Sequence, residues 1–462
     1  MAEALCCPAV LVAAPASGQG KTTVASALAR LHTRRGLRVA VFKCGPDFLD
    51  PFWLSLAVTA PGAEPAPVHQ LDLWMTGEAD CAARLRAAAQ AADLIIVEGV
   101  MGLFDGTPSA ADLARRFGLP VLAVINAAAM AGTFGALAFG LQHYQPGLRW
   151  AGVLANRVAG ARHEEMLRSG LRDPASWLGA LMRNTALSLP ERHLGLVAAG
   201  ELADASQRLD AAADALTETP LGRMTPQDLQ AWRVDFGAQA LALAPEGMLS
   251  RQPLNGRTVA IARDAAFCFI YAANLDCLRS LGAELVFFSP LAGEPLPRCD
   301  AVWLPGGYPE LHAPALSAHA ALRDGLARHV AEGRPVWAEC GGMMALFEHL
   351  HTAGGERHAM WGLLPGAVHM QSRLAALGPQ QLVLDGQVLR GHTFHYSTCE
   401  TTLLPLARST RPGTAPVAGQ GQGEAVYALG ALRASYFHAW FPSNPALVAR
   451  FFGATDATMP HV

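Results

Sequence analysis

Residues 17–23 of this 462-residue chain, SGQGKTT, have the types and spacing of a loop that binds phosphate. They follow an apolar run and precede a stretch with helical spacing, so backbone N–H groups and a helix N-terminus would point at phosphate oxygens. The Lys21 ammonium would neutralise the β- and γ-phosphates, and the Thr22 hydroxyl would ligate Mg²⁺. We therefore predict that ATP is bound by Ser17, Gly18, Gly20, Lys21, Thr22 and Thr23.

The match to the phosphate-loop pattern covers only its second half. The strict pattern begins with glycine at the position that Pro15 occupies in this chain. A glycine-rich turn with an unrelated lysine is the alternative interpretation. The order of apolar run, turn and helix-like stretch favours the phosphate loop.

Carboxylates follow two further apolar runs. Glu98 closes the run LIIVE, and Asp105 comes within the next loop. Asp47 and Asp50 follow the run that ends at Lys43. A single acidic residue after a strand is often a helix cap, but open α/β sheets bind ligands beyond the carboxyl ends of their strands. Loops that converge at this edge predict a nucleotide–metal site.

A second stretch, RPVWAECGGMMALF (334–347), places Cys340 after an apolar run and before two glycines. This is the order of a nucleophile elbow, in which glycines permit a tight turn that exposes the side chain at a sheet edge. The alternative is a buried packing residue, because free cysteine often behaves as a small hydrophobe. A thiol is mostly protonated at neutral pH, so a nucleophilic Cys340 needs a base or a helix N-terminus.

Two other stretches supply what such a nucleophile needs. His438, in SYFHAWF, ends another strand-like run and could be the base. Gly306 and Gly307, in LPGGYPE, could present backbone N–H groups to an oxyanion. Either feature alone is more often structural. Their order on successive strand-like runs favours a nucleophilic role for Cys340.

Two series of apolar runs must position these residues. The first series alternates with alanine- and leucine-rich helical stretches and comprises Val10–Ala14, Val39–Lys43, Leu94–Glu98, Val121–Asn126 and Trp150–Asn156. The second comprises 257–264, 283–290, 301–307, 334–342 and 433–441. Such alternation predicts parallel sheets covered by helices, hence an α/β protein. We expect an N-terminal domain over 1–200, a connector over 201–255, a C-terminal domain over 256–452 and an exposed loop over 409–424.

Length and composition limit the classes of function. A chain of 462 residues exceeds one ordinary core, and its 51% hydrophobic and 16% charged residues suit compact domains. The formal charge of -3 offers no electrostatic attraction to nucleic acid or an anionic membrane. Nine cysteines without CxxC spacing fit reduced thiols better than a disulfide framework or a zinc site. With no transmembrane-length apolar stretch and no signal-peptide pattern at the start, we expect a cytoplasmic protein.

Taken together, these motifs make the chain resemble the cobyrinic acid a,c-diamide synthase family, which includes hydrogenobyrinic acid a,c-diamide synthase. These enzymes are ATP- and glutamine-dependent amidoligases of cobalamin synthesis. GPDFLDP together with EGVMGLFDG separates them from cobyric acid synthase. The resemblance runs almost end to end, through SGQGKTT, FKCGPDFLDP, LDLWM, EGVMGLFDG, GVLANRV, LPERHLGL, RDAAFCF, ELVFFSPL, PGGYPELHA, AECGGMMAL, GHTFHYS and ASYFHAWFPSNP.

The resemblance implies a P-loop domain like dethiobiotin synthetase, followed by a domain like a class I glutamine amidotransferase. Cys340 would attack the glutamine amide with the help of His438. Ammonia, guided internally, would displace phosphate from an acyl phosphate, once at each of the a and c acetates of the corrin ring. The implied residues are Gly306, Gly307 and Gly341 for the oxyanion and glutamine, Thr22, Asp47 and Glu98 for Mg²⁺, and Asp50, Asp72 and Asp105 for substrate or phosphate. A homodimer is also expected.

Three departures from the family pattern bear on these roles. Trp440 stands two residues after His438, where many amidotransferases have a carboxylate. His69 and Gln70 replace the usual Arg-Asn, which concerns a corrin contact. Ala14-Pro15 replaces a frequent Gly-Thr in the phosphate loop.

Other functions share part of this pattern. A related ligase could amidate nickel-sirohydrochlorin, and a cobyric acid synthase-like activity is disfavoured by GPDFLDP. A ParA/MinD-like ATP switch would need the phosphate loop but neither Cys340 nor His438. A C-terminal half that only scaffolds is the least specific alternative, and the presence of both residues argues against it.

Overall fold

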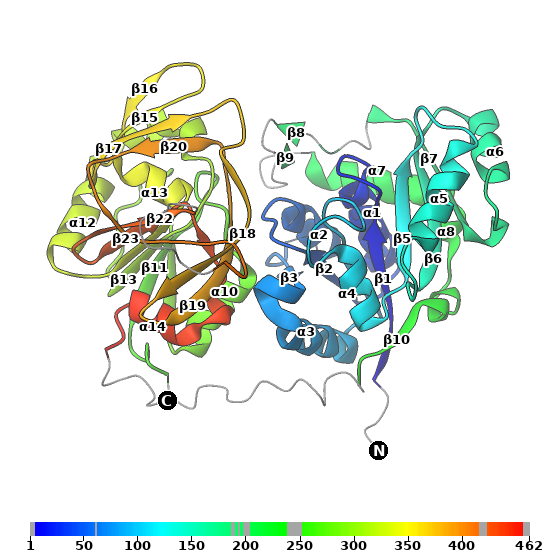
Figure 1. The fold of residues 1–462 in the computed structure, drawn as a ribbon, viewed down its shortest axis with the longest axis horizontal. Coiled ribbons are helices and arrows are strands. Elements are labelled where there is room, and N and C mark those ends of the chain that lie inside the picture. Colours follow the sequence, from blue (N-terminus) through cyan, green and yellow to red (C-terminus); the bar gives the residue numbers. More distant parts are fainter. Residues whose placement is uncertain are drawn as a thin grey trace. The chain divides into compact units, whose positions relative to one another are not determined.

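The computed structural model describes residues 5–60, 62–185, 189, 191–192, 195–196, 204–237, 252–414 and 423–455. The chain forms two compact units, Met1–Glu246 and Gly247–Val462, and each has its own central sheet flanked by helices (Figure 1). This confirms the predicted α/β class and the order of the two halves.

The sheet of the first unit has the strand order β3-β2-β4-β1-β5-β6-β7, and these strands are parallel. The strands are β1 (Cys6–Ala13), β2 (Val39–Cys44), β3 (His69–Leu71), β4 (Leu94–Glu98), β5 (Val121–Asn126), β6 (Trp150–Val158) and β7 (Trp177–Met182). The short β10 (Arg233–Asp235) pairs antiparallel with the start of β1, and β8 (Glu191–Arg192) pairs with β9 (Gly195–Leu196). Every strand of the first predicted series is confirmed.

Helices cover both faces of this sheet, so its strands are buried on both sides. Alternate residues of β1 enter two separate cores, with Leu11 in one and Val10 in the other. The helices are α1 (Lys21–Arg34), α2 (Asp50–Val58), α3 (Glu78–Ala91), α4 (Ala110–Phe117), α5 (Thr133–His143), α6 (Ala161–Ser169), α7 (Ala205–Thr217) and α8 (Pro220–Arg223). Short helical turns add Leu73–Gly77, Pro174–Ser176 and Asp228–Trp232.

Part of the connector expected over 201–255 packs within the first unit. Helix α7 buries Leu209, Ala213 and Leu216 in the same core as α1, and Arg30 of α1 pairs with Asp210 at 2.7 Å. Strand β10 extends the sheet next to β1. An alanine-rich helix shows little apolar contrast in sequence, yet its small side chains allow close contact with α1. Residues 238–251 lie outside the described ranges.

The main sheet of the second unit has the order β12-β11-β13-β14-β23-β22-β21. The first five strands are parallel, and β22 and β21 continue antiparallel. The strands are β11 (Thr258–Ala262), β12 (Glu284–Phe288), β13 (Ala301–Leu304), β14 (Val336–Glu339), β21 (Pro405–Arg408), β22 (Ala425–Leu429) and β23 (Leu432–Ser435). The helical segments are α10 (Ala272–Ser280), Pro309–Leu311, α11 (Ala313–Ala318), α12 (Ala320–Ala331), α13 (Gly341–Leu346), Phe441–Ser443 and α14 (Pro445–Phe451).

Two smaller sheets in this unit were not predicted from the sequence, because no strand was expected between 347 and 400. One contains β15 (Phe347–His351), β16 (Arg357–Ala359), β17 (Leu364–Met370) and β20 (Ser397–Glu400). The other joins the hairpin β18 (Ala376–Leu384) and β19 (Gln387–His395) to β24 (His438–Ala439). The predicted run 433–441 is therefore two short strands in different sheets. Residues 415–422 of the loop expected over 409–424 lie outside the described residues.

No helix in the described part of the chain is long and apolar enough to cross a membrane.

Candidate active sites

The phosphate-loop residues lie between β1 and α1, where the sequence predicts them. Ser17 and Gly18 are exposed, and Gly20 precedes α1 with a φ of 95°. This left-handed conformation is one that glycine adopts without strain. A Cβ on Gly20 would also lie 2.2 Å from Asn156 Nδ2, so the position has no room for a side chain.

Lys21 begins α1 and turns its ammonium back across the loop. Its Nζ donates hydrogen bonds to the carbonyls of Ala16 (3.0 Å) and Met101 (2.6 Å). Burial, with Lys43 nearby, lowers the pKa of Lys21 to about 8. The Lys21 ammonium thus lies between the phosphate loop and the loop that follows β4.

Lys43 lies among three of the predicted carboxylates. It was not predicted from the sequence as a residue of the site. Its Nζ lies 2.5 Å from Asp50 Oδ2, 3.2 Å from Glu98 Oε1 and 3.9 Å from Asp47 Oδ2. Burial alone would lower the pKa of this lysine, but the surrounding carboxylates raise it. The available signal was a lysine inside an apolar strand-like run, because a buried charge is usually paired.

The carboxylates of this cluster respond differently to the same cation. Lys43 holds the pKa of Asp50 below its usual range in spite of burial. Burial and the neighbouring Asp50 raise the pKa of Asp47 to about 7 and that of Glu98 to about 8. The three carboxylates therefore ionise to different extents, and Asp50 is the one that ionises most readily.

Thr22 and Glu98 meet at the position expected for a phosphate-bound cation. The Thr22 hydroxyl donates to Glu98 Oε1 at 2.6 Å, while Glu98 Oε2 is buried without a hydrogen-bond partner among the described residues. A hydroxyl and an unsatisfied carboxylate oxygen are hard oxygen ligands that suit Mg²⁺. Within the described ranges, no three His, Cys, Asp or Glu side chains form a metal cage, so such an ion would also need phosphate oxygens and water.

The remaining predicted acidic residues make local backbone contacts. Asp105 Oδ2 accepts from Gly102 N at 2.8 Å and closes the loop after β4. Asp47 Oδ1 accepts from the backbone of Leu49 and Asp50. Asp72 Oδ1 caps the turn 73–77 by accepting from two backbone N–H groups, which gives Asp72 a structural contact independent of any ligand.

Two asparagines that the sequence analysis did not single out brace the phosphate loop. Asn156, at the end of β6, donates from Nδ2 to the Gln19 carbonyl at 2.9 Å. The backbone N–H of Asn126, at the end of β5, donates to Gln19 Oε1 at 2.8 Å. GVLANRV carried the signal for Asn156, a polar residue near the end of a buried strand.

Cys340 occupies a strained turn between β14 and α13, as the sequence predicts. Its φ of 44° and ψ of -107° are rarely adopted by residues other than glycine. Its backbone N–H donates to the Ser435 carbonyl at 2.7 Å. Burial and the nearby Glu310 raise the pKa of the Cys340 thiol, so the thiol needs a base to ionise.

The predicted glycines converge on this turn. A Cβ on Gly341 would lie 2.9 Å from Gly307 N, and one on Gly342 would lie 2.1 Å from the Leu304 carbonyl oxygen. A Cβ on Gly306 would lie 2.5 Å from His438 Cε1. Gly307 thus lies next to the turn at Cys340, and Gly306 lies next to His438, the predicted base. Neither glycine position has room for a side chain.

His438 lies on β24, directly across from His392 of β19. The two rings are stacked with centroids 4.9 Å apart, and His438 is fully buried. Burial, with His392 and His395 nearby, holds the pKa of His438 well below its usual value. A neutral imidazole is the form that can accept a proton from a thiol.

Glu339, immediately before Cys340, is the carboxylate that faces His438. Glu339 Oε2 lies 3.9 Å from His438 Nδ1, and both side chains are buried. Glu339 Oε1 accepts from Trp337 Nε1 at 2.6 Å and from Ala439 N at 3.3 Å. Burial raises the pKa of Glu339 to about 8.

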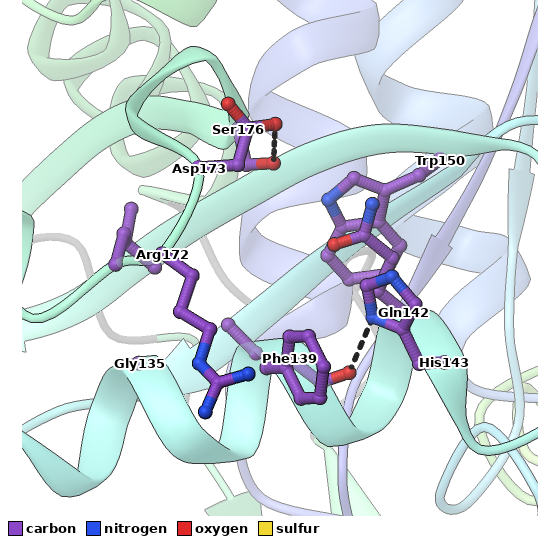
Figure 2. A pocket seen from close by; sticks show the side chains of 10 residues that line it. Gly135, Phe139, Gln142, His143, Trp150, Arg172, Asp173 and Ser176 are labelled. Atoms are coloured by element: carbon purple, nitrogen blue, oxygen red, sulfur yellow. Dashed lines mark hydrogen bonds between the residues drawn. The ribbon is translucent and has the colours of Figure 1, made fainter.

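A cavity of about 260 Å³ in the first unit lies apart from the phosphate loop (Figure 2). It is lined by residues of α5 and by Trp150, the first residue of β6, whereas Asn156 at the phosphate loop is near the other end of that strand. The Arg172 guanidinium lies over the Phe139 ring at 4.5 Å. The cavity shares no residue with the carboxylate cluster around Lys43.

Both halves of the chain match known domain families. A model described as CobQ/CobB/MinD/ParA nucleotide binding domain matches residues 10–197, and one described as CobB/CobQ-like glutamine amidotransferase domain matches residues 258–446. The hydrogenobyrinate a,c-diamide synthase of Pseudomonas aeruginosa is 53% identical over 98% of this chain and 99% of that protein. The chain belongs to the a,c-diamide synthase family.

Other members of the a,c-diamide synthase family carry a second name. The cobyrinate a,c-diamide synthase of Herminiimonas arsenicoxydans is 48% identical to this chain, and the alignment covers 96% of each protein. A solved glutamine amidotransferase structure aligns with 42% of this chain and 96% of its own length, at 20% identity and a TM-score of 0.30.

In this member of the a,c-diamide synthase family, the departures noted in the sequence have defined surroundings. Trp440 is fully buried and meets Tyr271 edge-on at 5.1 Å between ring centroids. His69 Nδ1 lies 2.8 Å from Arg84 Nη1, and Gln70 Nε2 donates to the Asp47 carbonyl at 3.1 Å. Gln70 therefore supports the carboxylate loop from the neighbouring strand β3.

Proposed function

We propose that this chain catalyses the ATP- and glutamine-dependent amidation of the a and c acetate side chains of cobyrinic or hydrogenobyrinic acid in cobalamin biosynthesis. The observation that carries the proposal is a full-length relationship at 53% identity to an a,c-diamide synthase, in a chain that contains both half-sites. The half-sites are the phosphate loop with its buried carboxylate cluster and the strained turn at Cys340.

In the C-terminal half-site, His438 takes the proton of the Cys340 thiol, and the sulfur attacks the side-chain carbonyl of glutamine. Backbone N–H groups at Gly307 and Gly341, with Gly306 beside them, stabilise the oxyanion. The C–N bond breaks as His438 returns the proton to nitrogen, which leaves ammonia and a glutamyl thioester. Water then attacks the thioester, releasing glutamate and restoring the thiol.

In the N-terminal half-site, the backbone of Ser17–Gly20 and the start of α1 receive the phosphates of ATP, joined by Thr22 and Thr23. The Lys21 ammonium must leave the carbonyls of Ala16 and Met101 to reach the phosphates. Lys43, which pairs with Asp50 and Glu98, would hold positive charge close to the transferred phosphoryl group and the substrate carboxylate. We assign Asp50, Asp72 and Asp105 to orienting that substrate or phosphate.

A magnesium ion would be held by Thr22 and Glu98, with Asp47 nearby, and would supply positive charge to the phosphate oxygens. The fit rests on the unsatisfied Oε2 of Glu98 beside the Thr22 hydroxyl.

The two half-reactions complement each other chemically. A carboxylate does not react with ammonia directly, so transfer of the γ-phosphoryl group first converts it into an acyl phosphate. Ammonia then displaces phosphate and leaves an amide. Free ammonia is mostly ammonium at neutral pH, so local production from glutamine delivers the reactive form and limits hydrolysis of the acyl phosphate.

A tetrapyrrole other than a corrin, such as nickel-sirohydrochlorin, is the closest alternative substrate. An ATP switch of the MinD/ParA kind is disfavoured by the strained turn at Cys340 and by the 96–99% coverage of the synthase relatives.

The decisive experiment incubates the purified chain with Mg-ATP, glutamine and cobyrinic acid, hydrogenobyrinic acid or nickel-sirohydrochlorin, and follows product mass. Each replacement of a carboxyl OH by NH₂ lowers the mass equally, so two successive steps are expected with one or both corrinoids. Glutamate release and ATP hydrolysis without a mass change on either corrinoid would overturn the proposed substrate.

We also propose that the reaction takes place in the cytoplasm, where ATP and glutamine are abundant, and that the enzyme is a homodimer. The resemblance to the family supports the dimer. Light scattering of the purified protein gives the mass that tests it.

A further inference from the structure

His438 is the base of the proposed glutaminase reaction. Many amidotransferases have a carboxylate two residues after this histidine, but this chain does not. The residue two positions after His438 is Trp440, which is buried against Tyr271 and cannot act as a carboxylate. A general base works best when a third group fixes its ring orientation and tautomer. His438 therefore requires an acidic side chain from another part of the fold.

Glu339 is an acidic side chain close to His438, although it is far from His438 in the sequence. It is the last residue of β14 and directly precedes Cys340, so it belongs to the nucleophile turn rather than to the histidine strand. Its Oε2 lies 3.9 Å from His438 Nδ1, with both side chains almost completely buried. Catalytic hydrogen bonds are often this long before substrate binds.

The second oxygen of Glu339 fixes the orientation of the carboxylate. Oε1 accepts from Trp337 Nε1 at 2.6 Å and from Ala439 N at 3.3 Å. Because Ala439 follows His438, the second bond ties Glu339 to the backbone next to the base. Oε2 is left facing the imidazole.

We propose that Glu339 is the positioning residue of the glutaminase site and that it replaces the carboxylate usually found two residues after the histidine. By accepting a hydrogen bond from His438 Nδ1, it keeps the proton on that nitrogen and leaves Nε2 free to take the thiol proton. It also stabilises the imidazolium that forms when Cys340 is ionised. This inference rests on the proposed glutamine hydrolysis and adds a residue to it.

A purely structural role is the competing explanation, because Glu339 also joins Trp337 to the backbone of Ala439. Two variants separate the roles. Glu339→Gln retains an oxygen for Trp337 and Ala439 but removes the negative charge. Trp337→Phe removes one donor to Oε1 and leaves the carboxylate facing His438.

The test measures glutamate release from glutamine by the full-length protein. Glu339→Gln is expected to lower kcat about 100-fold or more, as loss of a base-orienting carboxylate does, with little change in KM for glutamine. Trp337→Phe should lower kcat less than tenfold. ATP-dependent amidation supplied with ammonium salt should proceed at the wild-type rate in both variants, since it bypasses Cys340.

The pH profile adds a readout that a structural role would not move. With the pKa of Glu339 raised to about 8, its charged fraction grows as pH increases through that value, so wild-type kcat should rise between neutral and alkaline pH. Other titratable groups near the pair are Cys340, His392 and His395, with Glu310 and Glu424 acting on Cys340, and all of them are common to both proteins. The profile of Glu339→Gln should lack this rise.

Equal losses in Glu339→Gln and Trp337→Phe, or an unchanged kcat in Glu339→Gln, would overturn the inference. If Glu339→Gln unfolds, Glu339→Asp decides, since partial activity supports a charge role and its absence in a folded protein opposes it. Glutamate release by the wild type without corrinoid amidation would refute the proposed substrate and leave this test valid. A wild type that releases no glutamate would overturn both.

Discussion

The Lys43 ammonium and the Cys340 thiol are both buried. The surroundings of Lys43 stabilise its charged form, whereas those of Cys340 stabilise its neutral form. Lys43 is surrounded by Asp47, Asp50 and Glu98, which keep it ionised. Burial, followed by the nearby Glu310 carboxylate, raises the pKa of the Cys340 thiol, so this thiol stays protonated. A permanent cation therefore lies in the proposed ATP site, whereas the proposed nucleophile Cys340 is ionised only when a base accepts its proton.

At the residue scale, Cys340→Ser should abolish amidation driven by glutamine while amidation driven by ammonium salt continues. Loss of a covalent nucleophile lowers kcat by about 1000-fold or more, but ammonia needs no thiol to reach the acyl phosphate. Product mass with each nitrogen source gives the measurement. Equal loss with both sources would contradict the assigned role.

Lys43→Met should have the reverse effect. Without the cation, Asp50 and Glu98 remain buried without their counter-ion, so the free energy of unfolding of the first unit should fall by about 3 kcal/mol. Amidation should be lost with either nitrogen source, while glutamate release stays near the wild-type rate. Calorimetry and a glutamate assay test both expectations. Arg30→Met, which breaks the more exposed pair with Asp210, is the control and should cost about 1 kcal/mol or less.

At the scale of elements, each site depends on a turn between a buried strand and a helix. The phosphate loop joins β1 to α1, and the Cys340 turn joins β14 to α13. Each turn has a glycine with no space for a Cβ, Gly20 in the first and Gly342 in the second. The strands fix where each turn begins, and the close contacts fix the path of its backbone.

The phosphate loop offers a matched pair of substitutions for testing this view. Gly20→Ala and Gly36→Ala both place alanine at a left-handed φ, 95° and 86°, so both should lose about 1 kcal/mol of stability from the backbone. Only position 20 has a neighbour in the way, Asn156, whereas nothing lies within 4 Å at position 36. Gly20→Ala should therefore weaken ATP binding at least tenfold in calorimetric titration, and Gly36→Ala should leave it unchanged. Equal affinities would show that the contact with Asn156 is unimportant.

At the scale of the whole molecule, the proposed function assigns a separate reaction to each unit, with ammonia as the product that joins them. If ammonia passes internally from the C-terminal half-site to the N-terminal one, a mixture of Cys340→Ser and Lys21→Met chains should amidate poorly from glutamine at neutral pH, although each mutant retains one half-reaction. Ammonia would then have to cross bulk water, where it is protonated and diluted. Comparison with wild type at equal concentration of active sites gives the measurement. A mixture as fast as wild type would show that ammonia travels through solution.

The sequence predicted what is local to each turn and little of what depends on the packing of distant strands. SGQGKTT and AECGG each show strand, turn and helix in one stretch, and both were located correctly. Lys43 was missed because its partners come from β4 and from the loop after β2, which meet only once strand order is known. Glu339 was missed for the same reason, since its partner His438 lies on a strand of another sheet. In each case the usable signal was a charged residue within an apolar run.

Strand β4 lies between β2 and β1 in the sheet of the first unit, and the two lysines at the proposed ATP site, Lys21 and Lys43, have a further property in common. They are the only lysines in the 462-residue sequence, so every other strong cation of the chain is arginine. A reagent or an acetylating enzyme that acts on lysine side chains can therefore modify this protein only where ATP is expected to bind. Mass spectrometry of the acylated protein would report on access to that site, because both lysines are buried and the sequence contains no other lysine that could react.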